Sequence, residues 1–194
     1  MKKTKLGLLA IIMLITVMLL TGCGNNNTTT DNKKGDSLGG LPVYTAEETP
    51  DWSTFDEISG IEFKYPANYK SIGTSSMPMY MDPDVAGATL NVVTSSFPSS
   101  LSFEGYVDAS IPGIKSQMDI DGDVKVEYIN LNGQKAAKLD YVATSQGQTM
   151  SITQVLIKKN GNAYILTLGV LKADKDENKA GINEKYEKIV KSFK

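Results

Sequence analysis

The sequence predicts an α+β domain in which helices cover a single antiparallel sheet. The first observation is a series of four strand-like segments over 123–171, separated by short turns that contain glycine. The second is a pair of segments, 102–118 and 181–194, in which apolar residues recur at helical spacing. Strands joined by tight turns pair antiparallel, and amphipathic helices bury one face against a sheet, so this pattern favours the α+β class.

The four segments over 123–171 are expected to form an antiparallel meander. Each turn between them pairs a polar residue with a glycine: Asn132-Gly133, Gln146-Gly147 and Asn160-Gly161. The last two segments, 148–159 and 162–171, carry apolar residues on both faces. A strand of that kind is covered on both sides, so we expect these two strands at the centre of the sheet.

The segments 60–72 and 88–97 are further strand candidates, because apolar and polar residues alternate in the first and β-branched residues fill the second. Ser102 is expected to cap the helix at 102–118. Pro112 is expected to break or kink that helix near its end, because proline lacks the backbone N–H.

The C-terminal segment 181–194 predicts an amphipathic helix that lies on the sheet. Its apolar residues form one stripe: Ile182, Tyr186, Ile189, Val190 and Phe193. Glu184 and Lys188, and likewise Glu187 and Lys191, stand four residues apart in the order that stabilises a helix. We interpret this charged face as solvated helix surface.

The composition excludes several classes of chemistry. The chain has 194 residues with 20 basic and 22 acidic side chains, and every basic residue is lysine, with no histidine and no arginine. Without histidine there is no Ser-His-Asp or Cys-His arrangement, and with one cysteine there is no zinc site made of His and Cys ligands. A net charge of −2 without a basic stripe argues against nucleic-acid binding.

The N-terminus has the pattern of a lipoprotein signal peptide. Lysines at positions 2, 3 and 5 precede an apolar run over 6–20, which is short for a membrane-spanning helix. The following Leu20-Thr21-Gly22-Cys23 resembles a bacterial lipobox, so we expect cleavage between Gly22 and Cys23 and lipid on Cys23. The alternative is an uncleaved N-terminal anchor, and both readings place the domain outside the cytoplasm at the cell membrane.

Three regions follow from this pattern: a signal peptide at 1–22, a lipidated Cys23 with a flexible polar tether at 23–44, and a globular domain at 45–194. The tether is rich in Gly, Asn and Thr, a composition that does not form a core. If Cys23 carries lipid, no cysteine remains for a disulfide, and the core alone stabilises the fold.

A methionine-rich stretch at 75–84 is the candidate binding site. Met77, Met79 and Met81 alternate, with Tyr80 among them. Thioethers on one side of an extended segment suit Cu(I), and Met or Tyr can ligate haem iron. Clustered methionines also suit a surface for an apolar ligand or a protein partner, and they also fill gaps in ordinary cores. All three interpretations stay open, and neither a cofactor nor a metal is the main expectation.

Two acidic clusters are interpreted as structural. In 119–123, "DIDGD", the glycine falls at the fourth position of a would-be calcium loop, and position 130 is asparagine instead of glutamate, so we expect a tight turn before a strand. The second cluster, 172–178, is expected to lead into the last helix, whose N-terminus favours acidic residues.

The order of motifs resembles the PsbP-like family. "GIEFKYPANYKSI", "SFEGYV", "INLNGQKAAKLDY" and the final "IVKSFK" carry the resemblance, which extends over roughly 55–194. The family includes the PsbP subunit of photosynthetic water oxidation, bacterial lipoproteins such as DcrB and a Ran-binding import factor. The resemblance implies a six- or seven-stranded antiparallel sheet with helices on both faces, and it implies no shared catalytic set.

The function expected from these features is that of a membrane-anchored, non-catalytic binding or accessory module. It would serve an envelope complex or a small apolar ligand, with a protein partner in the envelope. Two alternatives are a lipoprotein that binds haem or copper through 75–84, and a cell-envelope hydrolase. The hydrolase would need a lysine-activated serine or an acidic pair assembled from distant segments.

Replacing Cys23→Ala tests the lipid anchor. Without the cysteine there is no thioether to carry acyl chains, so labelling of the full chain by a palmitate analogue in cells should disappear. Label that persists on the variant would refute lipidation at Cys23.

Overall fold

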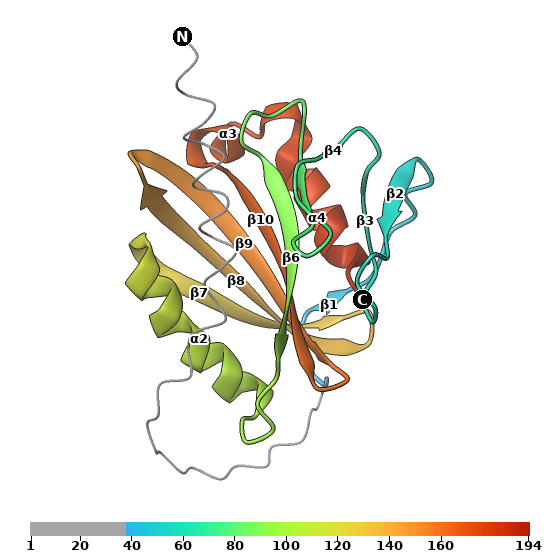
Figure 1. The fold of residues 1–194 in the computed structure, drawn as a ribbon, viewed down its shortest axis with the longest axis vertical. Helices are drawn as coiled ribbons and strands as arrows, with labels where there is room; N and C mark the ends of the chain where they lie inside the picture. The colour runs from blue at the N-terminus through green and yellow to red at the C-terminus, as the bar shows by residue number, and fades with distance from the viewer. Residues whose placement is uncertain (1–37) are drawn as a thin grey trace.

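The computed structural model describes residues 38–194. In chain order the strands are β1 (Val43–Tyr44), β2 (Trp52–Phe55), β3 (Phe63–Pro66), β4 (Lys70–Ser71), β5 (Met79–Met81), β6 (Thr89–Ser96), β7 (Asp119–Leu131), β8 (Gln134–Ser145), β9 (Gln148–Lys159) and β10 (Asn162–Leu171). Eight of them form one sheet in the order β1-β7-β8-β9-β10-β6-β5-β4, and β2 and β3 form a separate hairpin (Figure 1). The class is α+β, as predicted.

The expectation of a single sheet with six or seven strands is wrong. The main sheet has eight strands, and β2 and β3 pair only with each other. The two edge strands, β1 and β4, and β5 next to β4 are two or three residues long and too short to show an alternating pattern. β1 also pairs parallel to β7, with Val43 opposite Asn130, although it falls in the segment predicted as tether.

The predicted meander is confirmed as β7 to β10. Each hairpin turn combines a polar residue and a glycine that both have positive φ, as Asn132 (52°) and Gly133 (83°) do in the first turn. β9 and β10 lie at the centre of the sheet, and nearly all of their side chains are buried. The prediction that these two strands are covered on both faces is therefore confirmed.

The segment 119–123 is part of a strand, so the predicted turn there is wrong. β7 begins at Asp119 and pairs with β8 from its first residue, and the register shifts between Asp121 and Lys125. Gly122 lies inside the shift with φ of 83°, a backbone conformation that glycine adopts without strain. A β-bulge accommodates the extra residues and keeps the strand paired on both sides of it.

Helix α2 (Phe103–Gln117) covers one face of the sheet. Ser102 caps it as predicted, because its Oγ accepts a hydrogen bond from the Gly105 N–H at 3.0 Å. The helix continues through Pro112, so the predicted break is wrong. Its apolar side packs into a core cluster with β8, β9 and β10, in which Val107 and Ile114 are almost fully buried.

Helix α4 (Ile182–Ser192) covers the opposite face, together with the β2-β3 hairpin (Figure 1). Both predicted ion pairs are present, at 2.7 Å between Glu184 and Lys188 and at 2.9 Å between Glu187 and Lys191. The predicted helices on both faces are thus confirmed. Two shorter elements, α3 (Lys172–Asp176) and the 3-10 turn η1 (Lys179–Gly181), join β10 to α4. No helix within 38–194 has the length and hydropathy that a membrane span needs.

The C-terminus closes the core between α4 and β3. Phe193 is fully buried, and its ring packs edge-on against Phe63 at 6.2 Å between centroids. Next to it, Glu62 and Lys194 exchange backbone hydrogen bonds of 2.8 and 2.9 Å. This strand-like exchange fixes the end of the chain to the β2-β3 hairpin.

Phe193→Ala should destabilise the domain strongly. The deletion leaves a cavity that the paired backbone cannot close, and such changes cost about 3–5 kcal/mol of unfolding free energy. Urea titration of the full chain measures the loss. Leu101→Ala, at a side chain that is 36% exposed, is the control and should cost far less. Equal losses for the two variants would contradict the role given to Phe193.

Candidate functional site

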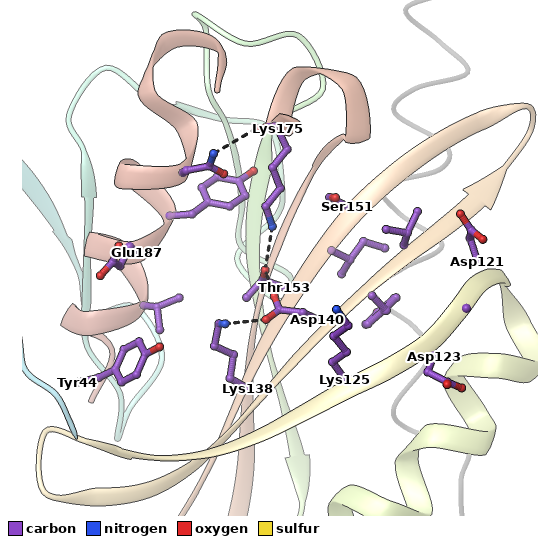
Figure 2. Close-up of a pocket in the computed structure, with 17 residues that line it drawn as sticks. Tyr44, Asp121, Asp123, Lys125, Lys138, Asp140, Ser151, Thr153, Lys175 and Glu187 are labelled. Carbon is purple, nitrogen blue, oxygen red and sulfur yellow. Dashed lines mark hydrogen bonds and ion pairs between the residues drawn. The ribbon is translucent and has the colours of Figure 1, made fainter. Parts of the chain in front are cut away.

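A groove lies on the sheet face beside α4, with a cavity volume of about 560 Å³. We call it the α4 groove. Its floor is made by β7, β8 and β9, and its walls by α3, α4 and Tyr44 of β1 (Figure 2). The lining residues are Tyr44, Asp121, Gly122, Asp123, Lys125, Lys138, Asp140, Tyr141, Val142, Ser151, Ile152, Thr153, Lys175, Asn183, Tyr186, Glu187 and Val190. A volume of this size is within the usual range for small-molecule sites.

The groove forms because one sheet face changes from apolar to polar along β8 and β9. On β9, Val155 and Ile157 point into the core beneath α4, whereas Ser151 and Thr153 point to the same face farther along. On β8, Lys138 and Asp140 occupy the equivalent inward positions. Helix α4 packs on the apolar part, so the polar part remains an open floor.

A hydrogen-bonded network organises this floor. Asp140 stands directly opposite Thr153 on the neighbouring strand, and the Thr153 hydroxyl donates to Asp140 Oδ1 at 2.5 Å. The Lys138 ammonium donates to Asp140 Oδ2 at 2.6 Å, and Glu127 Oε2 lies 3.8 Å from it. Both oxygens of the Asp140 carboxylate therefore have donors within the protein.

Lys175 reaches into the groove from α3. Its Nζ donates to Thr153 Oγ1 at 3.5 Å, and within residues 38–194 it forms no ion pair with a carboxylate. Burial lowers the pKa of Lys175. At Lys138 burial also lowers the pKa, but the hydrogen bond and charge of Asp140 outweigh it and raise the pKa above its usual value. The two lysines thus differ in whether a carboxylate neutralises them.

The acidic residues of the groove lie at its margins or have partners outside it. Asp121 and Asp123 are exposed at the far end in Figure 2, and Asp123 is paired with Lys115 at 3.4 Å. Glu187 pairs with Lys191. Asp140 is therefore the acidic side chain at the middle of the floor.

Two observations on the described residues concern metal and nucleophile chemistry at this site. Within 38–194, no group of three His, Cys, Asp or Glu side chains is arranged to hold a metal ion. Thr153, with a lysine nearby, is 5% exposed and lies in the middle of a central strand. Backbone N–H groups there pair with neighbouring strands, so they are not free to stabilise an oxyanion.

The structure separates the predicted methionine site from the α4 groove. Met79 and Tyr80 are buried in β5, whereas Met77 and Met81 are partly exposed. Tyr80 belongs to the core beneath α4 and donates a hydrogen bond to Glu57 at 3.0 Å. Alternation in β5 places Met79 and Met81 on one face and Tyr80 on the other, so Tyr80 does not share a face with these two methionines.

Other predicted features lie elsewhere. Gly22 and Cys23 are outside the described residues. The acidic segment 172–178 contains α3, where the buried Asp174 accepts a hydrogen bond from Lys179 at 2.6 Å. Lys175, also on α3, is the residue of this segment that reaches the groove.

Sequence reasoning missed the floor of the groove, although a signal was present. The inward-facing positions of β8 read Ala136, Lys138, Asp140 and Val142 once the strand and its buried face are known. Charged residues are rarely buried in a core, so their presence at core-facing positions indicates that this part of the sheet face is open. This signal identifies the α4 groove, but it can be recognised only when the register of β8 against β9 is known.

Asp140→Asn tests the floor network. The pKa of Lys138 should fall, because burial persists while the charged partner is lost. A lysine with a raised folded-state pKa stabilises the fold below its unfolded pKa, and that contribution is lost as the pH rises through the folded pKa. The variant should therefore lose about 1 kcal/mol at neutral pH, since solvent screens part of the pair, and the loss should shrink at strongly alkaline pH.

NMR titration of lysine side chains and urea unfolding at several pH values measure these two effects. Asp123→Asn, at a side chain that is 89% exposed, is the matched control. An unchanged Lys138 pKa in the Asp140→Asn variant would contradict the network.

Solved structures of other proteins are similar to this chain. Cyanobacterial PsbP (CyanoP) from Synechocystis sp. PCC 6803 aligns with a TM-score of 0.56 and 17% identity, over 81% of this chain and 96% of that one. LpqN of Mycobacterium tuberculosis, involved in cell envelope biogenesis, gives 0.48 and 14%, over 69% and 81%. The Saccharomyces cerevisiae Ran-binding protein Mog1p gives 0.49 and 10%, over 74% and 94%.

Identities this low show likeness of fold alone, and the alignment with CyanoP supports the PsbP-like architecture. No curated protein matches the sequence. A family model, DcrB, matches residues 62–192, which include β3 to β10 and all three described α-helices. The chain therefore belongs to the DcrB family, whose fold is of the PsbP type.

Proposed function

We propose that this protein is a non-catalytic binding module of the cell envelope, held at the outer face of the cytoplasmic membrane by lipid on Cys23. The observation that carries the proposal is the α4 groove, a solvent-open cavity of about 560 Å³ with an ordered polar floor. The fold shared with CyanoP is consistent with an accessory or binding role. In this proposal the groove holds the ligand, and the tether keeps the domain near its site of action.

The tether and anchor are supported by the sequence pattern at 1–44. Two acyl chains on one cysteine suffice for stable anchoring, whereas a single chain does not. Removal of residues 1–22 takes away three lysines and leaves 17 basic and 22 acidic side chains. An acidic domain is repelled weakly by an anionic membrane, so the lipid supplies the attachment.

Two features favour binding over hydrolysis in the groove. The Thr153 hydroxyl gives its hydrogen bond to Asp140, so its proton is directed away from Lys175. The same hydroxyl is buried in a central strand. A nucleophilic oxygen needs room for the substrate and a nearby oxyanion site, and a paired central strand offers neither. The lowered pKa of Lys175 is the one property that suits a general base, and a hydrolase is for that reason the second candidate.

The methionine stretch offers a less favourable site for haem or copper. Met79 is buried, whereas Met77 and Met81 are partly exposed. A ligand that uses the Met79 thioether would need its covering residues to move, because this side chain is 3% exposed. The α4 groove needs no such change.

A groove-filling substitution tests the proposed site. Val142 lines the α4 groove from β8, so Val142→Trp should occupy the cavity with an indole ring. The full chain purified from its native membrane should carry a small molecule detectable by native mass spectrometry, and the variant should retain at least about tenfold less of it. Val43→Trp, at an edge side chain that is 70% exposed, adds the same ring elsewhere and should retain the ligand.

Absence of any bound molecule from the parent protein would contradict the binding role of the groove. Equal retention by Val142→Trp and Val43→Trp would place the ligand elsewhere. Turnover of ester or amide substrates that Lys175→Gln abolishes would replace the proposal with the hydrolase.

A further inference from the structure

We propose that the α4 groove recognises a small oxyanion, a carboxylate or phosphate group, which Lys175 and Lys125 receive from opposite sides. This inference rests on the proposed function and names the chemistry of its ligand. It assigns this task to two lysines in a chain that has no arginine for bidentate anion binding.

The first step is the row of residues across the sheet floor. Lys125 of β7 stands opposite Asp140 of β8, and Asp140 stands opposite Thr153 of β9. Directly opposed residues in antiparallel strands point to the same face with their Cβ atoms about 4.5–5.5 Å apart. Lys138, two residues from Asp140 on the same strand, joins this row from the side. Lys175 reaches it from above (Figure 2).

The second step is the balance of charge at this row. Three ammonium groups, those of Lys125, Lys138 and Lys175, stand near two carboxylates, that of Asp140 and that of Glu127, which lies 3.8 Å from Lys138. The Asp140 carboxylate is already engaged by Lys138 and Thr153, at 2.6 and 2.5 Å. Within 38–194 neither Lys125 nor Lys175 forms an ion pair with a carboxylate. The middle of the floor therefore carries excess positive charge, although the whole chain is acidic.

The third step is the orientation of the Lys175 ammonium. Thr153 donates its only hydroxyl proton to Asp140, so its oxygen is an acceptor toward Lys175. This long contact of 3.5 Å places Nζ above the floor and occupies at most one of its three N–H donors. The remaining donors are available to a ligand in the groove. Burial disfavours the charged form of Lys175, and an oxyanion placed against it would offset that cost.

The acidic groups at the margins limit the size and charge of the ligand. Asp121 and Asp123 lie at the far end of the groove, and Glu187 lies on its α4 wall. A polyanion or an anionic membrane surface would meet these carboxylates, whereas one small oxyanion at the centre would not. The side chains of Tyr44, Val142 and Val190 provide an apolar wall for the remainder of the ligand.

Binding of two simple probes to the full chain tests the inference. Titration with inorganic phosphate and, separately, with succinate is followed by the side-chain NMR signals of the lysines. We expect saturable shifts at Lys125 and Lys175 and a rise in the pKa of Lys175 on binding. The probe that binds more tightly distinguishes a phosphate from a carboxylate ligand.

Variants connect the binding to the groove. Lys175→Gln should weaken the tighter probe about tenfold or more, because it removes a charge-assisted hydrogen bond, and Lys175→Arg should restore part of the affinity. Lys70→Gln, at an exposed lysine of β4 away from the groove, is the matched control and should bind as the parent does. Unchanged urea midpoints verify that the variants are folded.

The outcomes separate this inference from the proposed function. If neither probe binds, or if Lys175→Gln and Lys70→Gln bind equally, the oxyanion inference is overturned. If in that case the parent protein still retains a native ligand that the Val142→Trp variant loses, the groove remains a binding site, but for a ligand without an oxyanion. If neither probe binds and the parent protein retains no native ligand, both proposals are overturned.

Discussion

The central strands β9 and β10 are apolar on both faces, and the rest of the structure depends on covering them. Helix α2 buries one face, while α4, the β2-β3 hairpin and the C-terminal Phe193 bury the other. Residues 38–194 contain no cysteine, so no disulfide assists the closure. The burial of apolar surface on both sides is thus the main stabilising contribution, as expected for a domain of this size.

The α4 groove results from a mismatch in length between the cover and the sheet. Helix α4 has 11 residues and spans about 17 Å, whereas β8 and β9 have 12 residues each and extend over about 40 Å. One helix of this length shields only part of their exposed face. Ser151 and Thr153 replace apolar residues where the cover ends, and Lys138 and Asp140 complete the polar floor. The same arrangement that closes the core therefore leaves the cavity open.

Long periodic elements could be predicted from the sequence, and short or irregular ones could not. Local interactions between residues close in the sequence could be predicted: the Ser102 cap, the ion pairs on α4 and the turn at Asn132-Gly133. The edge strands β1 and β4 depend on a neighbouring strand that comes from distant sequence. Pro112 is tolerated because packing of α2 on the sheet outweighs one lost backbone hydrogen bond. Tertiary contacts decide such elements, and local pattern does not contain them.

The site itself could be predicted less well than the fold, because its residues are ordinary until the strands are in register. Met77, Met79 and Met81 attract attention through composition, yet they lie outside the α4 groove, and Met79 is buried. Lys125, Asp140 and Thr153 come from three separate strands and meet only through pairing. Charged groups at core-facing positions cost desolvation unless partners satisfy them, so a sequence selected for stability alone would favour apolar residues there. Their presence beneath an incomplete cover is the physical reason to assign function to the α4 groove.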